Sequence, residues 1–275
     1  MTTPGRAHVM VWICPICKAP LTLTKLTWQC ENNHCFDCAK EGYVNLLPSH
    51  QKRSKQPGDD AAMINARRLI HNARLYEPLA ETIVEIITGT GRVKTLLDIG
   101  CGEGFYDAHL TDRHPDIAVY GIDIAKPAIK LAAAAYPGHH YAVAGSSHLP
   151  IETDSIDFAL CVFAPINDEE LIRVLRPGGY YLEVGPAPRH LWALREALYE
   201  EPREHSAKQR QILGTTLVSE GQCQYEQTLD NLLINALVMA TPFAYRGQRE
   251  KRASLLAREN MTLAMAFSWR LFQKI

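Results

Sequence analysis

The sequence passes from a strand pattern to a glycine loop within Thr95-Leu96-Leu97-Asp98-Ile99-Gly100-Cys101-Gly102-Glu103-Gly104. The first half of this stretch is a short apolar run followed by turn residues, which predicts a buried strand. Its three glycines predict a loop whose backbone can adopt positive φ or come close to a ligand, although a glycine loop can also be a plain tight turn. A helical pattern follows over residues 106–113. The stretch therefore predicts a strand, a glycine loop and a helix in succession.

Strands and helices alternate beyond this stretch. A second strand over residues 119–122 ends at Asp123, and residues 127–135 form its helix; further strands are expected over residues 140–143, 158–163 and 180–184. This alternation predicts a doubly wound, mainly parallel α/β sheet. In such a sheet the glycine loop and Asp123 face one another at the carboxyl ends of the strands, where ligands bind. The Asp123 carboxylate would accept hydrogen bonds from two ribose hydroxyls.

Five of the eight cysteines lie within the first 38 residues, which predicts a metal site. Cys14 and Cys17 form a Cys-x-x-Cys knuckle, and Cys30 and His34 follow after twelve residues. Four such ligands suit tetrahedral zinc, and a site closed by four protein ligands is structural because no position is left for water. The leucines between the two pairs predict a short hairpin that brings one pair back to the other.

The fourth ligand is open on spacing alone. Cys35 and Cys38 stand near His34, and either could replace it geometrically. Redox-active or buried thiols are the alternative interpretation of the cluster, although disulfides are not expected in a reducing compartment.

Composition excludes several classes of protein. The chain has 275 residues, 47% of them hydrophobic and 21% charged, which is incompatible with disorder. Its longest nearly uncharged apolar stretch, residues 232–245, is too short to span a bilayer, so no membrane partner is expected. The apolar run at residues 9–13 is too short for a signal-peptide core, which favours a cytoplasmic location.

The net charge of −1 hides an asymmetry between the two ends of the chain. Residues 1–75 hold ten Lys or Arg against five Asp or Glu, which amounts to +5, and the remaining residues carry −6. A basic front end on an acidic body indicates either a polyanionic partner or a solvated basic surface.

The body resembles the class I S-adenosylmethionine-dependent methyltransferases over about residues 78–275. The resemblance is carried by the glycine loop after Asp98, by Asp123 and by the turn Leu175-Arg176-Pro177-Gly178-Gly179. It implies a seven-stranded, Rossmann-like, mainly parallel sheet with an antiparallel terminal strand, from strands over residues 215–229 and 261–272 around a helix over 231–239. In that family the loop from Gly100 to Gly104 cradles the methionine part of the cofactor, and Asp123 holds the ribose. The acid that often binds the adenine amino group is Gly145 here, so the backbone or Ser146 would substitute for it.

The front end narrows the resemblance to the RlmA family. The residues that carry it are the zinc knuckles, the stretch Asp37-x-Ala39-Lys40-Glu41-Gly42-Tyr43-Val44-Asn45-Leu46-Leu47-Pro48, and Pro188-Arg189-His190-Leu191 further on. Members of that family methylate N1 of a guanine in a hairpin loop of 23S ribosomal RNA. The resemblance implies S-adenosylmethionine as cofactor, structural zinc and a homodimer.

The same resemblance implies particular site residues. It places the zinc ligands on Cys14, Cys17, Cys30 and His34, and leaves Cys35 and Cys38 outside the family pattern as packing residues. The cofactor-binding residues are expected to be Tyr76, Gly100, Gly102, Glu103, Asp123, Arg189 and His190.

The catalytic residue is left unassigned by the sequence. Guanine N1 bears a proton that must leave, so an acceptor should lie near the end of the fourth strand. Many amino-group methyltransferases place Asn/Asp-Pro-Pro-Tyr/Phe there, whereas this chain has Phe163-Ala164-Pro165 without the amide. Phe163 could stack on the base or be a core aromatic. Of the other polar candidates, His148 is interpreted as a surface histidine. Glu183, within the fifth strand, is interpreted as a structural residue.

Three parts are expected: a zinc-ribbon-like RNA-recognition module over residues 1–48, a basic linker and helix over 49–77, and the methyltransferase domain over 78–275. The expected RNA-facing residues are Lys25, Lys40, Lys52, Arg53 and Lys55. Two alternatives remain. A small-molecule methyltransferase would not need the basic module, and a non-catalytic zinc-dependent RNA-binding protein would not need the cofactor loop.

Overall fold

The computed structural model describes residues 10–51, 57–205, 210–241, 243 and 248–275. Three of the basic residues expected to face RNA, Lys52, Arg53 and Lys55, lie outside the described residues.

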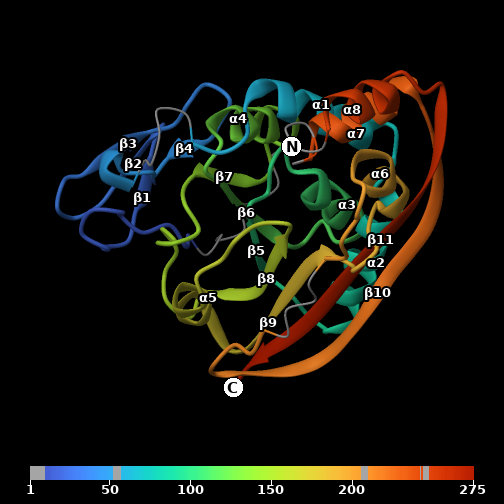
Figure 1. Cartoon of the computed structure of the whole chain (residues 1–275). Helices are drawn as coiled ribbons and strands as arrows, with labels where there is room; N and C mark the ends of the chain where they lie inside the picture. The colour runs from blue at the N-terminus through green and yellow to red at the C-terminus, as the bar shows by residue number, and fades with distance from the viewer. Residues whose placement is uncertain (1–9, 52–56, 206–209, 242, 244–247) are drawn as a thin grey trace.

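One mixed sheet of eight strands forms the centre of the described chain, in the order β10-β11-β9-β8-β5-β6-β7-β4 (Figure 1). The strands are β4 Val44–Asn45, β5 Thr95–Ile99, β6 Ala118–Asp123, β7 His140–Val143, β8 Ile156–Val162, β9 Leu175–Pro186, β10 Thr215–Asp230 and β11 Asn260–Lys274. From β4 to β9 all neighbours are parallel, whereas β11 is antiparallel to both β9 and β10. The seven expected strands and their antiparallel terminal strand are confirmed, and the two-residue β4 adds an eighth strand that is too short to carry a sequence pattern.

Helices cover both faces of this sheet. The helices are α1 Ala61–Asn72, α2 Glu77–Gly89, α3 Phe105–Arg113, α4 Lys126–Ala135, α5 Asp168–Val174, α6 Trp192–Leu198, α7 Asn231–Met239 and α8 Arg249–Leu256, with a 3-10 turn at Ser49–Gln51. Buried side chains of α1, α2, α3, α6, α7 and α8 share one core with Leu96 and Phe158 of the sheet. Those of α5 pack on the opposite face with Leu97 and Tyr181. Adjacent strand residues thus point into different cores, as the period of two in a strand requires.

The N-terminal module covers the part of the second face where no helix connects β7 to β8. Trp12 is fully buried there and meets Tyr120 edge-on, with ring centroids 5.4 Å apart. The Ile13 N–H donates to the Pro150 carbonyl at 3.0 Å, and the Glu152 N–H donates to the Val11 carbonyl at 2.8 Å. The module therefore contributes to the core of the sheet as well as forming its own small antiparallel sheet, β1 Thr22–Thr24, β2 Thr27–Gln29 and β3 Cys35–Asp37.

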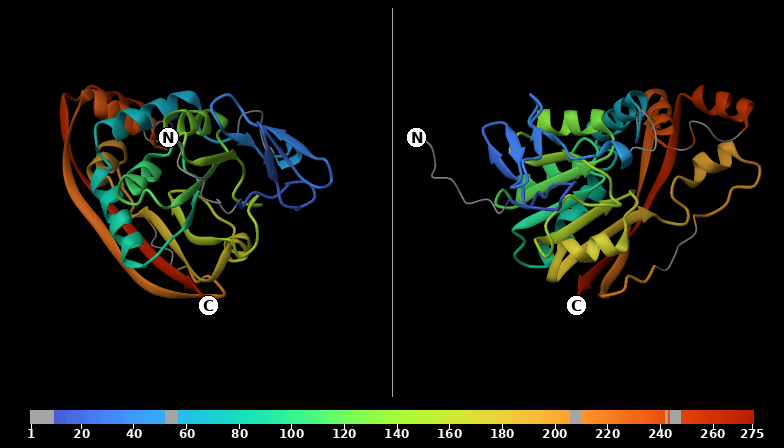
Figure 2. Two further views of the ribbon diagram at one scale, coloured as in Figure 1. Left: turned by 180° about the vertical axis from the view of Figure 1, so that it is seen from behind. Right: turned by 90° about the vertical axis from the view of Figure 1, so that its left-hand side faces the viewer.

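The module and the long β10–β11 hairpin lie at opposite ends of the sheet (Figure 2). The expected hairpin between the two pairs of zinc ligands is confirmed by the β1–β2 pairing, in which Leu23 faces Trp28. Within the described residues, no helix is long and apolar enough to cross a bilayer.

Candidate functional site

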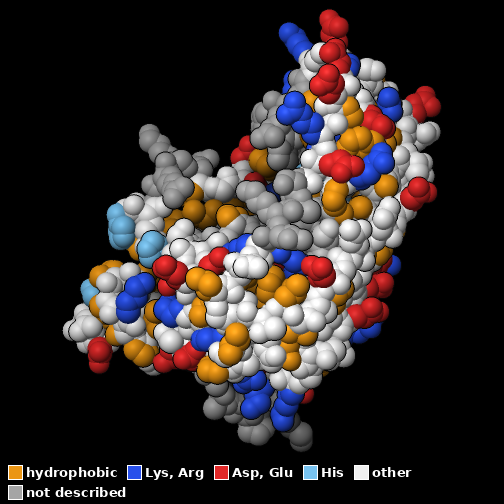
Figure 3. Space-filling view, turned by 60° about the horizontal axis from the view of Figure 1, so that its bottom comes forward, with side chains coloured by type: hydrophobic (Ala, Val, Ile, Leu, Met, Phe, Trp, Pro, Cys, Tyr) orange, Lys and Arg blue, Asp and Glu red, His pale blue; other side chains and the backbone are white. Residues whose placement is uncertain are grey.

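A cavity of about 2840 Å³ opens at the carboxyl ends of the parallel strands, where a doubly wound sheet binds its ligand. Its lining comes from the ends of β5, β6, β8 and β9, from α1, and from the N-terminal module, whose Pro15 and Lys18 lie on either side of Cys17. Figure 3 shows hydrophobic side chains beside a hollow, with Lys, Arg and His side chains at the end of the molecule that carries the module. The zinc knuckle and the glycine loop therefore border the same space.

The glycine loop has the positive φ angles that the sequence predicts. They are +81° at Gly100, +58° at Gly102 and +82° at Gly104. A Cβ on Gly100 would lie 2.4 Å from the Cβ of Ala164, so the loop packs directly against the segment after β8. At Gly102 nothing lies within 4 Å of the added carbon, and this glycine lines the cavity. Two glycines of one motif thus serve different purposes, close packing at the first and access to a ligand at the second.

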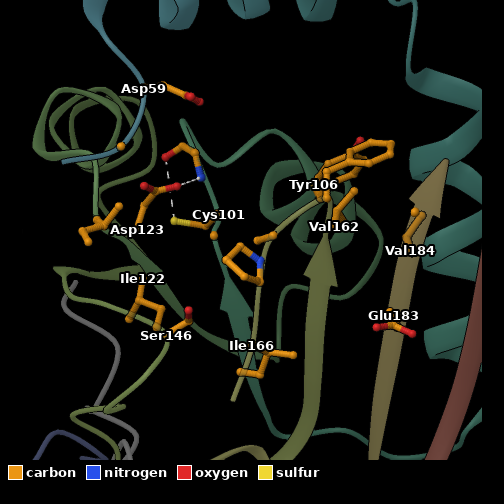
Figure 4. A pocket seen from close by; sticks show the side chains of 18 of the residues that line it. Asp59, Cys101, Tyr106, Ile122, Asp123, Ser146, Val162, Ile166, Glu183 and Val184 are labelled. Atoms are coloured by element: carbon orange, nitrogen blue, oxygen red, sulfur yellow. Dashed lines mark hydrogen bonds between the residues drawn. The ribbon is translucent and has the colours of Figure 1, made fainter. Parts of the chain in front are cut away.

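Asp123 ends β6 and faces this loop, as Figure 4 shows. Its Oδ2 accepts a hydrogen bond from the Gly102 N–H at 3.1 Å, and its Oδ1 accepts one from the Ala125 N–H at 2.7 Å. Burial raises the pKa of this carboxyl above its usual range. Each oxygen keeps further acceptor capacity for a ribose hydroxyl.

Two further carboxyls, those of Asp98 and Asp107, lie beneath the loop. Asp98 and Asp107 are almost completely buried, and burial is the main cause that raises both pKa values, that of Asp107 to about 6. The Tyr141 hydroxyl donates to Asp107 Oδ2 at 3.0 Å. In the described structure one oxygen of each carboxyl has no hydrogen-bond partner, which is consistent with a proton held between the two.

Most of the other expected cofactor residues meet in the cavity. Tyr76 is buried, which raises its pKa to about 12, and its ring meets that of Phe163 at 6.5 Å. Glu103 accepts a hydrogen bond from His71 Nδ1 at 2.8 Å. Burial is the main cause that lowers the pKa of His190 to about 4, and its Nδ1 accepts from the Ala266 N–H at 3.3 Å, which leaves the proton of the neutral ring on Nε2.

The structure brings together Tyr76, Gly100, Gly102, Glu103, Asp123 and His190. Arg189 is not among them: its side chain is exposed and its guanidinium lies over the Trp192 ring at 4.5 Å, outside the cavity lining.

Gly145, Ser146 and His148 line the cavity in the region expected to meet adenine. Across the opening from them lies a carboxylate that the sequence did not predict, Asp59 of the linker, which pairs with Arg67 at 2.5 Å. Figure 4 shows Asp59 on the far side of the cavity opening from Ser146. Its signal in the sequence was the Pro57-Gly58-Asp59 turn, where Gly58 has φ of +86° and packs on Ala125.

The four expected zinc ligands converge at the N-terminal module. The ligand atoms of Cys14, Cys17, Cys30 and His34 all lie within 4.8 Å of one another. The Cys17 and Cys30 sulfurs are 3.7 Å apart, and two thiolates on one tetrahedral zinc would be roughly 3.8 Å apart, so the donor set fits the ion. The Asn32 side chain donates to the Cys17 sulfur at 3.3 Å and is the main cause that lowers the pKa of this thiol to about 6.

His34 is therefore the fourth member of the cluster. Cys35 is exposed and Cys38 is partly buried, and neither belongs to the group of ligand atoms.

Phe163 also lines this cavity. It follows β8, has φ of +58° and leaves 47% of its surface exposed, which does not suit a core aromatic. Strained backbone of this kind persists where the surroundings hold it, often at functional sites. Its ring lies 5.8 Å from that of Phe267 and 6.3 Å from that of His190.

A glycine loop facing an acid across the ends of the first two strands, with a terminal antiparallel hairpin, defines a class I S-adenosylmethionine-dependent methyltransferase. Residues 96–179 match the family described as methyltransferase domain, and residues 12–55 match the N-terminal zinc ribbon of RlmA.

The full-length relatives identify the family. The chain is 33% identical to the 23S rRNA (guanine(748)-N(1))-methyltransferase of Streptomyces fradiae over 267 residues, 93% of this chain and 94% of the relative. It is 32% identical over 260 residues to YxjB of Bacillus subtilis (strain 168), whose name assigns it provisionally to the 23S rRNA (guanine-N1)-methyltransferases, with 88% of this chain and 89% of the relative covered. The chain belongs to the family of 23S rRNA (guanine-N1)-methyltransferases.

Proposed function

We propose that the protein transfers a methyl group from S-adenosylmethionine to N1 of a guanine in a hairpin loop of 23S ribosomal RNA. One observation carries the proposal: the zinc knuckle and the cofactor loop line a single cavity. A small-molecule enzyme would not need a zinc module at that wall, and a purely RNA-binding protein would not need the loop that faces Asp123. Both alternatives lose support because the two features share one space.

The cofactor supplies an activated methyl group, and the protein supplies alignment, which carries much of the catalysis in such displacements. Asp123 is proposed to hold the ribose, and Gly100, Gly102, Glu103, Tyr76 and His190 to surround the methionine part. Arg189 would serve only indirectly, since it lies outside the cavity.

The guanine is proposed to leave the RNA loop and stack on Phe163, whose exposed ring stands at the end of β8. Flipped bases are commonly read in this way, by stacking and by contacts to their Watson–Crick edge. Lys18, Lys25 and Lys40 would contact phosphates from the module, and contacts of that kind weaken as salt is raised.

The assembly is proposed to be a homodimer in the cytoplasm. The outer edge of β10 supports this proposal, because its sixteen residues form an end of the described sheet and an unpaired edge can accept another strand. Sedimentation analysis tests the dimer and cell fractionation tests the location.

Methylation of 23S ribosomal RNA from a strain that lacks the modification tests the activity. Primer extension should arrest at one guanine after incubation with cofactor and the full-length, zinc-loaded protein. A titration with S-adenosylmethionine belongs beside it. Cofactor binding without RNA methylation would favour the small-molecule alternative, and RNA binding without cofactor binding would favour the non-catalytic one.

A further inference from the structure

The group that accepts the guanine N1 proton can be sought among the acids of the cavity. Within the described residues the lining contains five of them: Asp59, Glu103, Asp123, Glu183 and Glu220. Asp59 pairs with Arg67, Glu103 accepts from His71, and Asp123 accepts from the glycine loop, so these three lie in the cofactor half.

Glu183 lines the cavity from β9, the neighbour of β8, and Phe163 directly follows β8. β8 and β9 pair in parallel, so Cys161 is opposite Glu183, and the Phe163 N–H donates to the Val184 carbonyl at 3.0 Å. Figure 4 shows Glu183 on β9, across the cavity from Asp123. Glu220, by contrast, is an exposed residue of the edge strand β10. Glu183 is therefore the remaining lining acid, and it lies on the strand that is hydrogen-bonded to the Phe163 backbone.

Two arginines fix the orientation of this carboxylate. Arg210 Nη1 donates to Glu183 Oε1 at 2.8 Å, and Arg270 Nη2 donates to Glu183 Oε2 at 2.5 Å. Arg270 also donates to the Arg210 carbonyl at 3.0 Å, and Arg210 also pairs with Asp168. The Glu183 side chain keeps 23% of its surface exposed, so its remaining lone pairs can be reached from the cavity.

This arrangement matches the Watson–Crick edge of guanine. N1–H and the N2 amino group are adjacent donors and need an acceptor with two oxygens, whereas O6 beside them is an acceptor and needs a donor. Glu183 with its arginines offers an acceptor next to a donor. Glu183 with its arginines can therefore satisfy the donors and the acceptor of the guanine Watson–Crick edge.

We propose that Glu183 is the catalytic residue that binds N1–H and N2–H of the flipped guanine and accepts the N1 proton, while an arginine beside it donates to O6. The N1–C bond forms as the bond between the methyl carbon and the sulfonium sulfur breaks, its electron pair stays on sulfur, and the N1 proton passes to Glu183. The loss of positive charge from sulfur is balanced by release of that proton. This proposal rests on the proposed function.

The first test compares Glu183→Gln with Asp168→Asn in the full-length, zinc-loaded protein. Both substitutions remove an ion pair of Arg210, but Asp168 does not line the cavity. Glu183→Gln should lower kcat for RNA methylation about 100-fold or more, the usual scale for loss of a general base, with an unchanged Kd for S-adenosylmethionine. Asp168→Asn should keep kcat within about threefold. If Glu183→Gln lowers the unfolding midpoint, Glu183→Asp keeps the charge, withdraws the carboxylate by one methylene and should still lower kcat about tenfold.

The second test changes the RNA. An RNA with inosine at the target position lacks the N2 amino group and should be methylated about tenfold more slowly by the wild type, which corresponds to one lost hydrogen bond to a charged group. Glu183→Ala should show no such difference between guanosine and inosine.

The proposal is overturned if Glu183→Gln retains kcat within threefold, or if inosine costs Glu183→Ala as much as the wild type. In either case the wild type still methylates RNA, so the proposed function stands. If the wild type does not methylate 23S RNA, the proposed function and this assignment fall together.

Discussion

Gly100 and Gly102 stand two residues apart in the same loop, and replacing each by alanine should have different consequences. Both have positive φ, so both substitutions force an L-residue into the left-handed region. They differ in surroundings, because a Cβ on Gly100 would lie 2.4 Å from the Cβ of Ala164, whereas a Cβ on Gly102 would meet nothing within 4 Å. Gly102→Ala is therefore a matched control for the steric part of Gly100→Ala.

The magnitudes follow from these two contributions. The left-handed conformation costs an alanine about 1–2 kcal/mol. Two carbons attract best at about 3.5–4.0 Å, so the contact with Ala164 forces a shift of more than an ångström, and overpacking of this kind costs about 1–3 kcal/mol. Gly100→Ala should lower the free energy of unfolding by about 2–5 kcal/mol, and Gly102→Ala by about 1–2 kcal/mol.

Urea unfolding of the wild type, both single variants, Ala164→Gly and the double variant Gly100→Ala/Ala164→Gly measures these differences. The double variant removes the clashing carbon, so a coupling energy of about 1–3 kcal/mol should return. A cofactor titration should show the opposite ranking: Gly102→Ala weakens S-adenosylmethionine binding at least about tenfold, because its methyl group enters the cavity. Equal losses of stability for the two alanines, or no rescue by Ala164→Gly, would refute the assignment of close packing to one glycine and ligand access to the other.

Three further predictions concern the metal, the buried acids and the ribose. His34→Ala should lose the zinc and weaken S-adenosylmethionine binding about tenfold, because the zinc knuckle adjoins the backbone pairing that supports residues 144–150, a second segment that lines the cavity. Metal analysis and a cofactor titration check this, with exposed Cys35→Ala as the control that keeps both. The raised pKa of Asp107, about 6, means that its contribution is complete below about pH 4 and is lost as pH rises through 6. Asp107→Asn should therefore flatten the loss of about 2–3 kcal/mol between pH 4 and 8 in urea unfolding, whereas substitution of exposed Asp112 on the same helix should leave the profile steep. Asp123→Ala should weaken cofactor binding about 100-fold by calorimetry, since two hydrogen bonds to a charged acceptor are lost; a Kd within threefold of the wild type would contradict its place at the ribose.

Much of the fold and of the two sites was predictable because the signals are local. The boundaries of β5, β7 and α7 agree with the sequence patterns, since each is a short periodic run bounded by turn or capping residues; the Asp230 side chain, for example, accepts from the Leu233 N–H at the start of α7. Cys14, Cys17 and Cys30 were predictable as zinc ligands because a knuckle and a hairpin bring nearby residues together, whereas spacing left the fourth ligand open and the structure places His34 in the cluster.

The roles that depend on distant contacts were not predictable from the sequence. Asp59, Glu183 and Arg189 have ordinary sequence surroundings, and only the packing of the linker, of β9 and of α6 places the first two at the cavity and the third outside it.

The sequence by itself determined the order of strands and helices, the glycine loop with its facing acid, and three of the metal ligands, because each of these depends on spacing along the chain. Tertiary structure alone decided that the zinc module replaces a helix on one face of the sheet and shares a cavity with the cofactor loop. The physical reason is that Trp12 and its neighbours become buried only against strands far away in the sequence, so no local pattern reveals where they pack.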